Sequence, residues 1–165
     1  MKITMGHRQA AHQITQWYLF HYRVLEAYVE GAEIFTLFDK LKADDQDRIR
    51  NMLRLKPFEN PVLIFTICEG QYIINTSERF VNITPVKKES VYYKDFDGFA
   101  YYESLHYVKK KRQKTDAPVT YIELGLKKKN GAILFWKIPS DNSGFFFWNV
   151  TRLIEGIKTK NQKTL

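Results

Sequence analysis

The sequence predicts an α+β fold in which N-terminal helices precede a seven-stranded antiparallel β-barrel or sandwich closed by one C-terminal helix. Three stretches with different hydrophobic patterns support this prediction. Apolar residues recur at helical spacing up to residue 56, alternate with a period of two from Pro61 onward, and return to helical spacing after Ser140. We therefore expect a helical N-terminal extension at residues 1–56 and a β-rich domain with its C-terminal helix at residues 57–165.

The N-terminal extension should be built from consecutive helices. Residues 8–30 are amphipathic and end before Gly31, a residue type that commonly follows a helix. The segment 32–41 carries apolar residues at helical spacing and predicts a second, shorter helix. Residues 43–55 begin with acidic residues, end with basic ones and precede Pro57, as expected of a further helix.

Short segments that alternate between apolar and polar residues follow, bounded by turn residues, which is typical of antiparallel strands. The predicted strands are 61–67, 71–76, 79–84, 89–93, 98–108, 119–127 and 132–138. Asn130-Gly131 is the strongest hairpin signal, because both residues tolerate a positive φ. Residues 140–158 begin with capping residues and continue with an apolar stripe, which predicts the C-terminal helix.

Composition limits the class of protein. The chain has 165 residues and a formal net charge of +8, which favours anionic partners without identifying them. Cys68 is the single cysteine, so the chain can form neither an intramolecular disulfide nor a cysteine-based zinc site. The N-terminus lacks the apolar segment of a signal peptide and no apolar run is long enough to span a membrane, so we expect a soluble, cytoplasmic protein.

The sequence contains no recognisable catalytic or metal-binding pattern. Its histidines form no His-Glu-x-x-His pair, and Asp95 and Asp97 precede a glycine, as turn residues often do. No phosphate-binding glycine loop and no nucleophile elbow occurs, and Cys68 ends a predicted strand, where a buried, unreactive thiol is expected. The sequence thus predicts a protein that is not an enzyme and that uses no cofactor.

Three stretches resemble a known family. The segments GQYIINTSERFVNI, SVYYKDFDGFAYYES and SGFFFWNVTRLIEGI are similar to a hairpin, the segment that follows it and the terminal helix of bacterial pleckstrin-homology-like domains. The resemblance covers residues 61–159 and implies a seven-stranded barrel with a scaffolding role, to which the N-terminal helices are an extension. Where lipid-binding relatives carry basic residues in their first strand-to-strand loop, this chain has a short loop with Glu69, so we do not expect inositol-lipid binding.

Two classes of partner fit this sequence, and the first is a protein or a second copy of the chain. The N-terminal extension holds more large aromatic residues than one helical face usually buries, and aromatic residues are favoured at interfaces. The candidate contact residues are Trp17, Phe20, Tyr22 and Tyr28. Packing of these side chains against the barrel is the alternative.

The second class of partner is nucleic acid. The candidate anion-binding residues form two runs, Lys109, Lys110, Lys111 and Arg112 in one and Lys127, Lys128 and Lys129 in the other. Tyr92, Tyr93 and Tyr102 are the aromatic residues left to accompany them on a surface. The two runs are predicted at opposite ends of paired strands, roughly 25–30 Å apart, so they do not form one compact phosphate site. Protein interaction or scaffolding is therefore the first prediction, and a basic nucleic-acid-binding accessory protein is the alternative.

Overall fold

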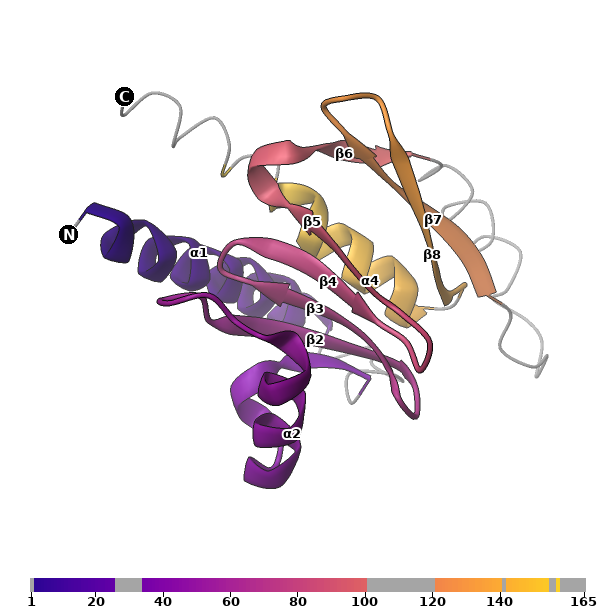
Figure 1. The fold of residues 1–165 in the computed structure, drawn as a ribbon. Helices are drawn as coiled ribbons and strands as arrows, with labels where there is room; N and C mark the ends of the chain where they lie inside the picture. Colours follow the sequence, from indigo (N-terminus) through magenta and orange to yellow (C-terminus); the bar gives the residue numbers. More distant parts are fainter. Residues whose placement is uncertain (1, 26–33, 101–120, 141, 155–156, 158–165) are drawn as a thin grey trace.

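The computed structural model describes residues 2–25, 34–100, 121–140, 142–154 and 157 of the chain (Figure 1). This part of the chain has an α+β fold with three α-helices and two antiparallel sheets, one of five strands and one of three. The α+β prediction is therefore confirmed. No helix among these residues is long and apolar enough to cross a membrane.

Consecutive strands are neighbours in both sheets. The helices are α1 (Lys2–Leu25), α2 (Ala43–Leu53) and α4 (Asn142–Thr151), with the short 3-10 helices η1 (Phe38–Lys40), η2 (Tyr93–Asp95) and η3 (Arg152–Ile154). The five-stranded sheet runs in the order β1 (Phe35–Leu37), β2 (Pro61–Cys68), β3 (Gln71–Thr76), β4 (Arg79–Ile83) and β5 (Lys88–Tyr92). The three-stranded sheet runs in the order β6 (Phe96–Ala100), β7 (Tyr121–Lys128) and β8 (Ile133–Pro139).

Strands β2 to β8 lie at the segments where the sequence predicts strands. The hairpin at Asn130-Gly131 is confirmed as well. Gly131 has a φ of 86°, and the side-chain oxygen of Asn130 accepts a hydrogen bond from the Ala132 amide at 3.0 Å. The greater part of the predicted strand 98–108 lies outside the described residues.

The predicted helix at 32–41 is wrong for the residues that the structure describes. Phe35–Leu37 form β1, which pairs with β2, and the Thr66 amide extends this pairing with a bond of 2.7 Å to the Ile34 carbonyl. Phe35 is buried, with its ring edge-on to that of Phe65. Backbone pairing and burial against a distant strand thus outweigh the local helical pattern.

The strands form two separate sheets where the sequence predicts one seven-stranded barrel. η2 connects β5 to β6 along the chain, yet within the described residues β5 pairs with β4 alone and β6 with β7 alone. With β1 included, the described strands number eight. The observed arrangement is therefore an open one of two layers.

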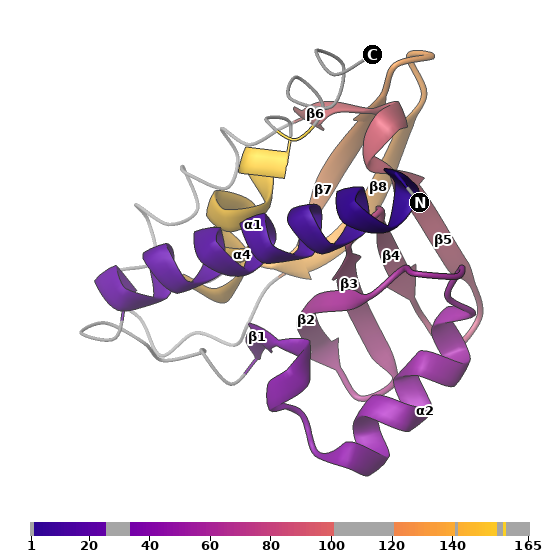
Figure 2. The same cartoon turned by 90° about the vertical axis from the view of Figure 1, so that its left-hand side faces the viewer.

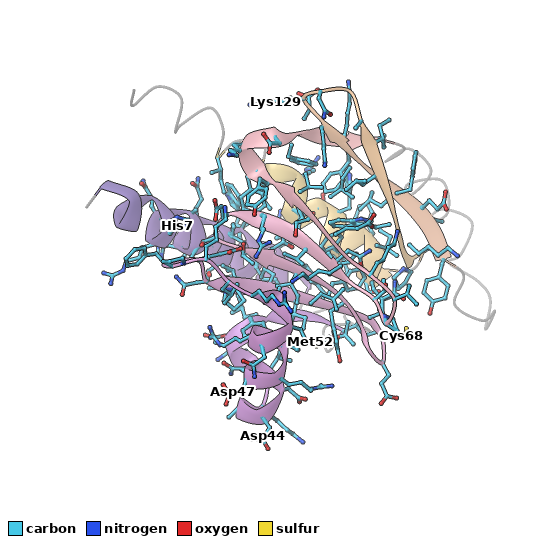
Figure 3. All side chains as sticks on the ribbon, in the orientation of Figure 1. His7, Asp44, Asp47, Met52, Cys68 and Lys129 are labelled. Carbon is cyan, nitrogen blue, oxygen red and sulfur yellow. The ribbon has the colours of Figure 1, made fainter. Side chains whose placement is uncertain are left out.

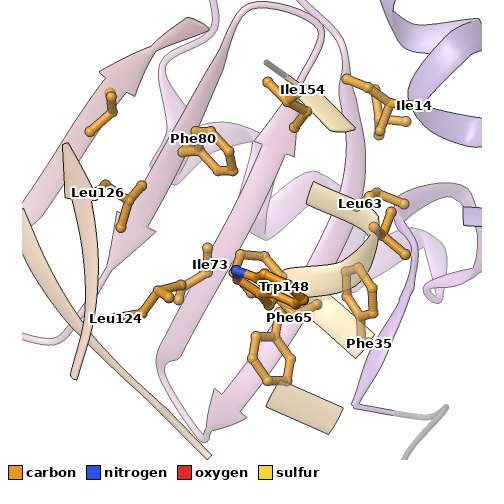
Figure 4. Close-up of a cluster of buried hydrophobic side chains, with 14 of the residues drawn as sticks. Ile14, Phe35, Leu63, Phe65, Ile73, Phe80, Leu124, Leu126, Trp148 and Ile154 are labelled. Carbon is orange, nitrogen blue, oxygen red and sulfur yellow. The ribbon is translucent and has the colours of Figure 1, made fainter. Parts of the chain in front are cut away.

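The main hydrophobic core lies between the two sheets and is shared with α1 and α4 (Figure 4). Phe147 connects α4 to the five-stranded sheet, because its ring stacks on Phe65 at 5.0 Å and meets Phe35 edge-on at 5.5 Å between centroids. Ile14 and Tyr18 bring α1 into the same core, and the Tyr18 hydroxyl donates to the Phe35 carbonyl at 3.1 Å.

A second core lies on the other face of the five-stranded sheet, beneath α2 (Figures 1 and 2). Ile49 and Leu53 of α2 pack there with Ile64 and Val81 of the sheet. Because both faces of the sheet are covered, β3 and β4 are buried almost continuously along their length. α2 therefore places the loop that follows it, residues 54–60, beside the sheet.

Candidate functional site

Five cationic side chains and one aromatic ring lie where the C-terminus of α2 meets β4 and β5. We call this cluster the Tyr92 surface, and its members are Arg54, Lys56, Arg79, Lys88, Tyr92 and Lys94. Figure 3 labels Met52, which lies in the last turn of α2 at this junction. The members come from three separate segments of the sequence, which the packing of α2 on the sheet brings together.

A buried ion pair between Arg79 and Glu59 anchors the Tyr92 surface. Arg79 Nε donates to Glu59 Oε1 at 2.7 Å and Nη2 donates to Oε2 at 3.2 Å, and the exposed fractions of the two side chains are 9% and 0%. Thr76 Oγ1 and the Lys56 amide donate to the same carboxylate at 2.7 and 3.0 Å. Burial alone would raise the pKa of Glu59, but these hydrogen bonds and the charge of Arg79 hold that pKa below its ordinary value. The carboxylate is therefore ionised at neutral pH.

The turn between β3 and β4 places Arg79 on the face that α2 covers. Thr76 Oγ1 accepts hydrogen bonds from the amides of Glu78 and Arg79 at 3.1 and 3.0 Å, which is the turn chemistry typical of threonine. Ser77 and Asn60 exchange two further bonds: the Ser77 amide donates to the Asn60 carbonyl at 2.8 Å, and the Asn60 amide donates to Ser77 Oγ at 3.1 Å. The Thr-Ser-Glu-Arg turn thus fixes both the start of β4 and the end of the loop after α2.

Two cations of the Tyr92 surface hold the C-terminus of α2. Arg79 Nη2 lies 3.4 Å from the carbonyl oxygens of both Leu53 and Arg54, and Lys88 Nζ donates to the Met52 carbonyl at 3.1 Å. Cations are favourable at this position, because the last carbonyl groups of a helix lack helical partners and carry partial negative charge. The helix ends at Arg54, whose φ of 50° turns the chain into the loop.

The half-buried ring of Tyr92 lies among three of these cations. Lys56 Nζ is 4.2 Å from the ring centroid, the guanidinium carbon of Arg79 is 5.6 Å away, and Lys94 Nζ is 5.8 Å away. Lys56 Nζ also donates to Glu78 Oε1 at 3.1 Å. Cations within about 6 Å of a ring centroid are attracted by its π face, so the ring helps to keep the positive charges together.

The Tyr92 surface carries an excess of positive charge. Its five cations face two carboxylates, those of the two ion pairs above, which leaves a net charge of +3. Arg54, Lys88 and Lys94 form no ion pair within the part of the chain that the structure describes. Partial burial and the positive charges of Arg54 and Arg79 lower the pKa of Lys88. An anion placed beside these cations would relieve that repulsion, so the surface favours an anionic ligand.

The predicted anion-binding lysines do not contribute to the Tyr92 surface. Residues 127–129 lie at the β7–β8 hairpin, and Figure 3 shows Lys129 at its tip, well separated from Met52. The hairpin borders the surface only at Lys94, because the Lys129 amide donates to the carbonyl of the next residue, Asp95, at 2.8 Å. Lys127 Nζ is 3.6 Å from Asp97 Oδ2, so its charge is partly balanced. The run at residues 109–112 lies outside the described residues.

The aromatic residues that we predicted as partner contacts differ in their exposure to solvent. Trp17 is half-buried and packs against the main core, as the packing alternative requires. Phe20 is 68% exposed, and its ring meets His21 edge-on at 5.6 Å between centroids. The side chains of Tyr22 and Tyr28 lie outside the described residues. Phe20 is therefore the predicted contact residue that α1 presents to solvent.

Of the tyrosines considered for a nucleic-acid surface, Tyr92 alone remains among the described residues. Tyr93 is buried, and its hydroxyl donates to the Thr76 carbonyl at 2.6 Å and accepts from Asn75 Nδ2 at 3.4 Å. Burial also raises the pKa of Tyr93. The prediction of Tyr93 as a surface residue is therefore wrong, and Tyr102 lies outside the described residues.

The residues considered for catalysis lie apart from one another. Cys68 is exposed at the end of β2, which corrects the expectation of a buried thiol, and its Sγ donates to Gln71 Oε1 at 3.7 Å. His7 Nδ1 lies 3.2 Å from Ser77 Oγ, a contact that ties α1 to the β3–β4 turn. The described residues contain no group of three or more His, Cys, Asp or Glu side chains that could hold a metal ion.

Sequence reasoning missed most of the Tyr92 surface. Three of its members, Arg54, Lys88 and Lys94, are single charges in short polar segments. Nothing in the neighbouring sequence distinguishes them from other exposed charged residues. One signal was available at Arg79, which shares its face of β4 with the apolar residues Val81 and Ile83 and is therefore a charge on a buried face. Such a charge requires a partner, and Glu59 supplies it.

Known proteins give no further guidance on the site. Comparison of the chain with protein-family models, with curated proteins and with solved structures finds no significant match. The function must therefore be inferred from the chemistry of the Tyr92 surface and of the exposed face of α1.

Proposed function

We propose that the protein is a non-catalytic binding module that holds nucleic acid at the Tyr92 surface, on a pleckstrin-homology-like scaffold. The order of the described elements supports this scaffold, because β2 to β5 form one antiparallel set, β6 to β8 form another, and α4 follows them. On this scaffold α1, β1 and α2 are additions. α2 is the addition that matters for binding, since it supplies the loop with Arg54 and Lys56.

The observation that carries the proposal is a surface of five cations, three of them without an ion pair among the described residues, that includes a half-buried aromatic ring. Arg54 and Lys94 can each approach a phosphate without first breaking an ion pair within the described residues, whereas Lys88 already donates to the Met52 carbonyl. Lysine and arginine contacts to phosphates provide most of the affinity of nucleic-acid binding, and aromatic side chains add stacking with bases. The buried Arg79–Glu59 pair holds the surface in place, so little order has to be gained on binding.

Fluorescence anisotropy with a labelled oligonucleotide tests the proposal. We expect binding that weakens steeply as salt rises from about 50 to about 200 mM, because phosphate contacts release counterions. The double variant Arg54→Gln/Lys94→Gln should bind more weakly, and the slope of log K against log salt should become less steep by about 2, roughly one unit for each lost contact. Both positions are exposed and neither side chain holds the fold together, so the variant should remain folded.

A matched control uses the hairpin lysines that the sequence analysis favoured. Lys127→Gln/Lys129→Gln removes the same charge from exposed positions of the β7–β8 hairpin, which borders the surface at Lys94 but lies away from the C-terminus of α2. This control should keep its affinity and salt slope close to those of the unaltered protein. The proposal is wrong if the unaltered protein ignores oligonucleotides, or if the hairpin variant loses binding while the Arg54/Lys94 variant does not.

The second candidate function is protein interaction or scaffolding through α1. The observation that favours it is Phe20, which is 68% exposed on a helix whose opposite face is buried in the main core. An exposed phenylalanine of this kind is a typical interface anchor.

Sedimentation equilibrium tests the second candidate with the chain as its own partner. If α1 mediates self-association, Phe20→Ser should shift the protein towards monomer, whereas Gln16→Ser, one turn earlier on the same helix, should not. A monomeric protein that Phe20→Ser leaves unchanged argues against self-association. Because Phe20 lies outside the Tyr92 surface, this result does not affect the nucleic-acid proposal.

A further inference from the structure

We infer that the nucleic acid is single-stranded and that Phe58 stacks on one of its bases. This inference rests on the function proposed above and adds the class of ligand. It begins with an unusual residue in the loop after α2: Phe58 has a φ of 69° and is 59% exposed. Bulky side chains rarely adopt the left-handed backbone conformation, and a phenylalanine exposed to this degree adds little to the core of its own chain.

The neighbours of Phe58 hold it in this conformation. On the C-terminal side, the buried carboxylate of Glu59 accepts hydrogen bonds from Arg79 and from the Lys56 amide, and the Glu59 amide donates to the Lys56 carbonyl at 3.1 Å. Asn60 Nδ2 donates to the carbonyl of Phe58 itself at 3.1 Å. The loop is thus fixed on both sides of the ring, and a strained, outward-facing residue held this way often serves binding.

The loop also joins Phe58 to the positive charge. Lys56, two residues before Phe58, reaches the ring of Tyr92 with its Nζ at 4.2 Å, and Arg54 begins the same loop. One short segment therefore presents an aromatic side chain together with cations. This combination of aromatic rings and positive charge is what sequence-tolerant binders of single strands use, with phosphates held by the cations and bases stacked on the rings.

The same features argue against a duplex as the preferred ligand. In a double helix the faces of the bases are covered by neighbouring base pairs, so a protein reaches the phosphates and the base edges. A protruding phenylalanine finds no base face there. In a single strand the bases can unstack, and a fixed phenyl ring offers them a surface without loss of side-chain order.

The test compares affinities of the full chain for a single strand of about 12 thymidines and for a blunt duplex of equal length, a size within the range that such surfaces cover. Phe58→Ala should weaken single-strand binding roughly 5- to 150-fold, the range seen when a stacking residue is truncated. Its affinity for the duplex should change less than about twofold. Phe58→Trp should restore single-strand binding, since it retains a ring for stacking.

Val86→Ala is the matched control, because Val86 is a 90% exposed apolar residue whose truncation removes no aromatic ring. Thermal unfolding of each variant verifies that the loop change has not unfolded the protein. The inference is overturned if Phe58→Ala lowers single-strand and duplex affinity equally, or changes neither affinity. If the Arg54/Lys94 variant still loses binding in that case, the proposed function stands without the inference. Binding of anionic lipid vesicles, in place of any oligonucleotide, would overturn both and assign the surface to a membrane.

Discussion

Removal of the Arg79 guanidinium should be among the most damaging single changes in this protein. Arg79→Met leaves the carboxylate of Glu59, which is 0% exposed, without the two hydrogen bonds of 2.7 and 3.2 Å that it receives from Arg79. It also removes the bonds from Arg79 to Ser90 and to the last carbonyls of α2. Removal of one partner from a buried ion pair typically costs about 3–5 kcal/mol, because the remaining charge stays buried without compensation. We expect a decrease of that size in the free energy of unfolding.

Urea denaturation followed by circular dichroism measures this cost. For a chain of this length the same loss corresponds to a decrease in Tm of roughly 6–20 °C. Arg48→Met is a suitable control, because Arg48 pairs with Asp45 at 2.8 Å in solvent, and exposed pairs contribute little to stability. The double variant Glu59→Met/Arg79→Met should lose less than the sum of the single changes, since it leaves no buried charge. The reasoning is refuted if Arg79→Met and Arg48→Met have equal effects.

Three further predictions concern stability and use the same measurement. The pKa of Glu59 is lower in the folded than in the unfolded state, so its contribution to stability is present above the unfolded-state pKa and is lost as the pH falls through the folded-state pKa. Glu59→Gln should therefore flatten the decrease in the free energy of unfolding that acid causes below about pH 5, and parallel curves for the two proteins would contradict this. Gly125→Ala should cost about 1–3 kcal/mol, since its Cβ would lie 2.9 Å from that of Ala100, whereas Gly6→Ala, with nothing within 4 Å, should stabilise α1 by about 0.5–1 kcal/mol. Phe147→Ala, at a fully buried ring, should cost about 3–5 kcal/mol, and a smaller change than Gly125→Ala causes would be inconsistent with its place in the core.

The strands were predictable from the sequence because their determinants are local. From Pro61 onward the alternation of side chains and the turn residues specify one hairpin after another, and β2 to β8 follow them. At Asn130-Gly131 the turn needs a positive φ, which Gly131 supplies at 86°. From β2 to β5, and from β7 to β8, neighbouring strands are joined by short turns, so their pairing required no long-range information.

The two errors in the fold come from interactions between distant segments. The pattern at residues 34–38 fits a helix, but pairing with β2 decides its structure, and β2 begins at Pro61. The division into two sheets depends on whether β5 and β6 pair across the corner at η2, which no local pattern reveals. Periodicity identifies an element and its exposed face, whereas pairing with a remote strand depends on tertiary packing.

The candidate site was hidden for a related reason. The lysine runs at residues 109–112 and 127–129 attract attention because their charges are adjacent in the sequence. The Tyr92 surface gathers single charges from the end of α2, the start of β4 and the region of β5, and it exists because α2 packs across the sheet. A run of like charges in a turn mainly keeps that turn in solvent, whereas charges assembled by the fold around a ring form a surface with a defined shape.

The effect of charge on binding can be distinguished from the effect of loop geometry, because the two predict opposite changes in affinity for one substitution. Glu59→Gln removes a negative charge and raises the net charge of the Tyr92 surface, so electrostatics alone would strengthen its binding to a single strand. The same change weakens the bonds that fix the loop carrying Phe58, so we expect the affinity to fall by roughly 3- to 10-fold as pre-organisation is lost.

Glu78→Gln supplies the control for this comparison, since Glu78 faces the same surface but its carboxylate forms an ion pair with the half-exposed Lys56 side chain and not with the backbone of the loop. Its removal should leave the affinity for a single strand unchanged or slightly raised, and anisotropy titrations at one salt concentration compare the two variants directly. If Glu59→Gln remains folded and binds as tightly as Glu78→Gln, the hydrogen bonds of the Glu59 carboxylate are not required for binding. Binding at this surface then depends on net charge alone. If Glu59→Gln binds more weakly despite its higher charge, the buried ion pair serves the binding surface as well as the fold.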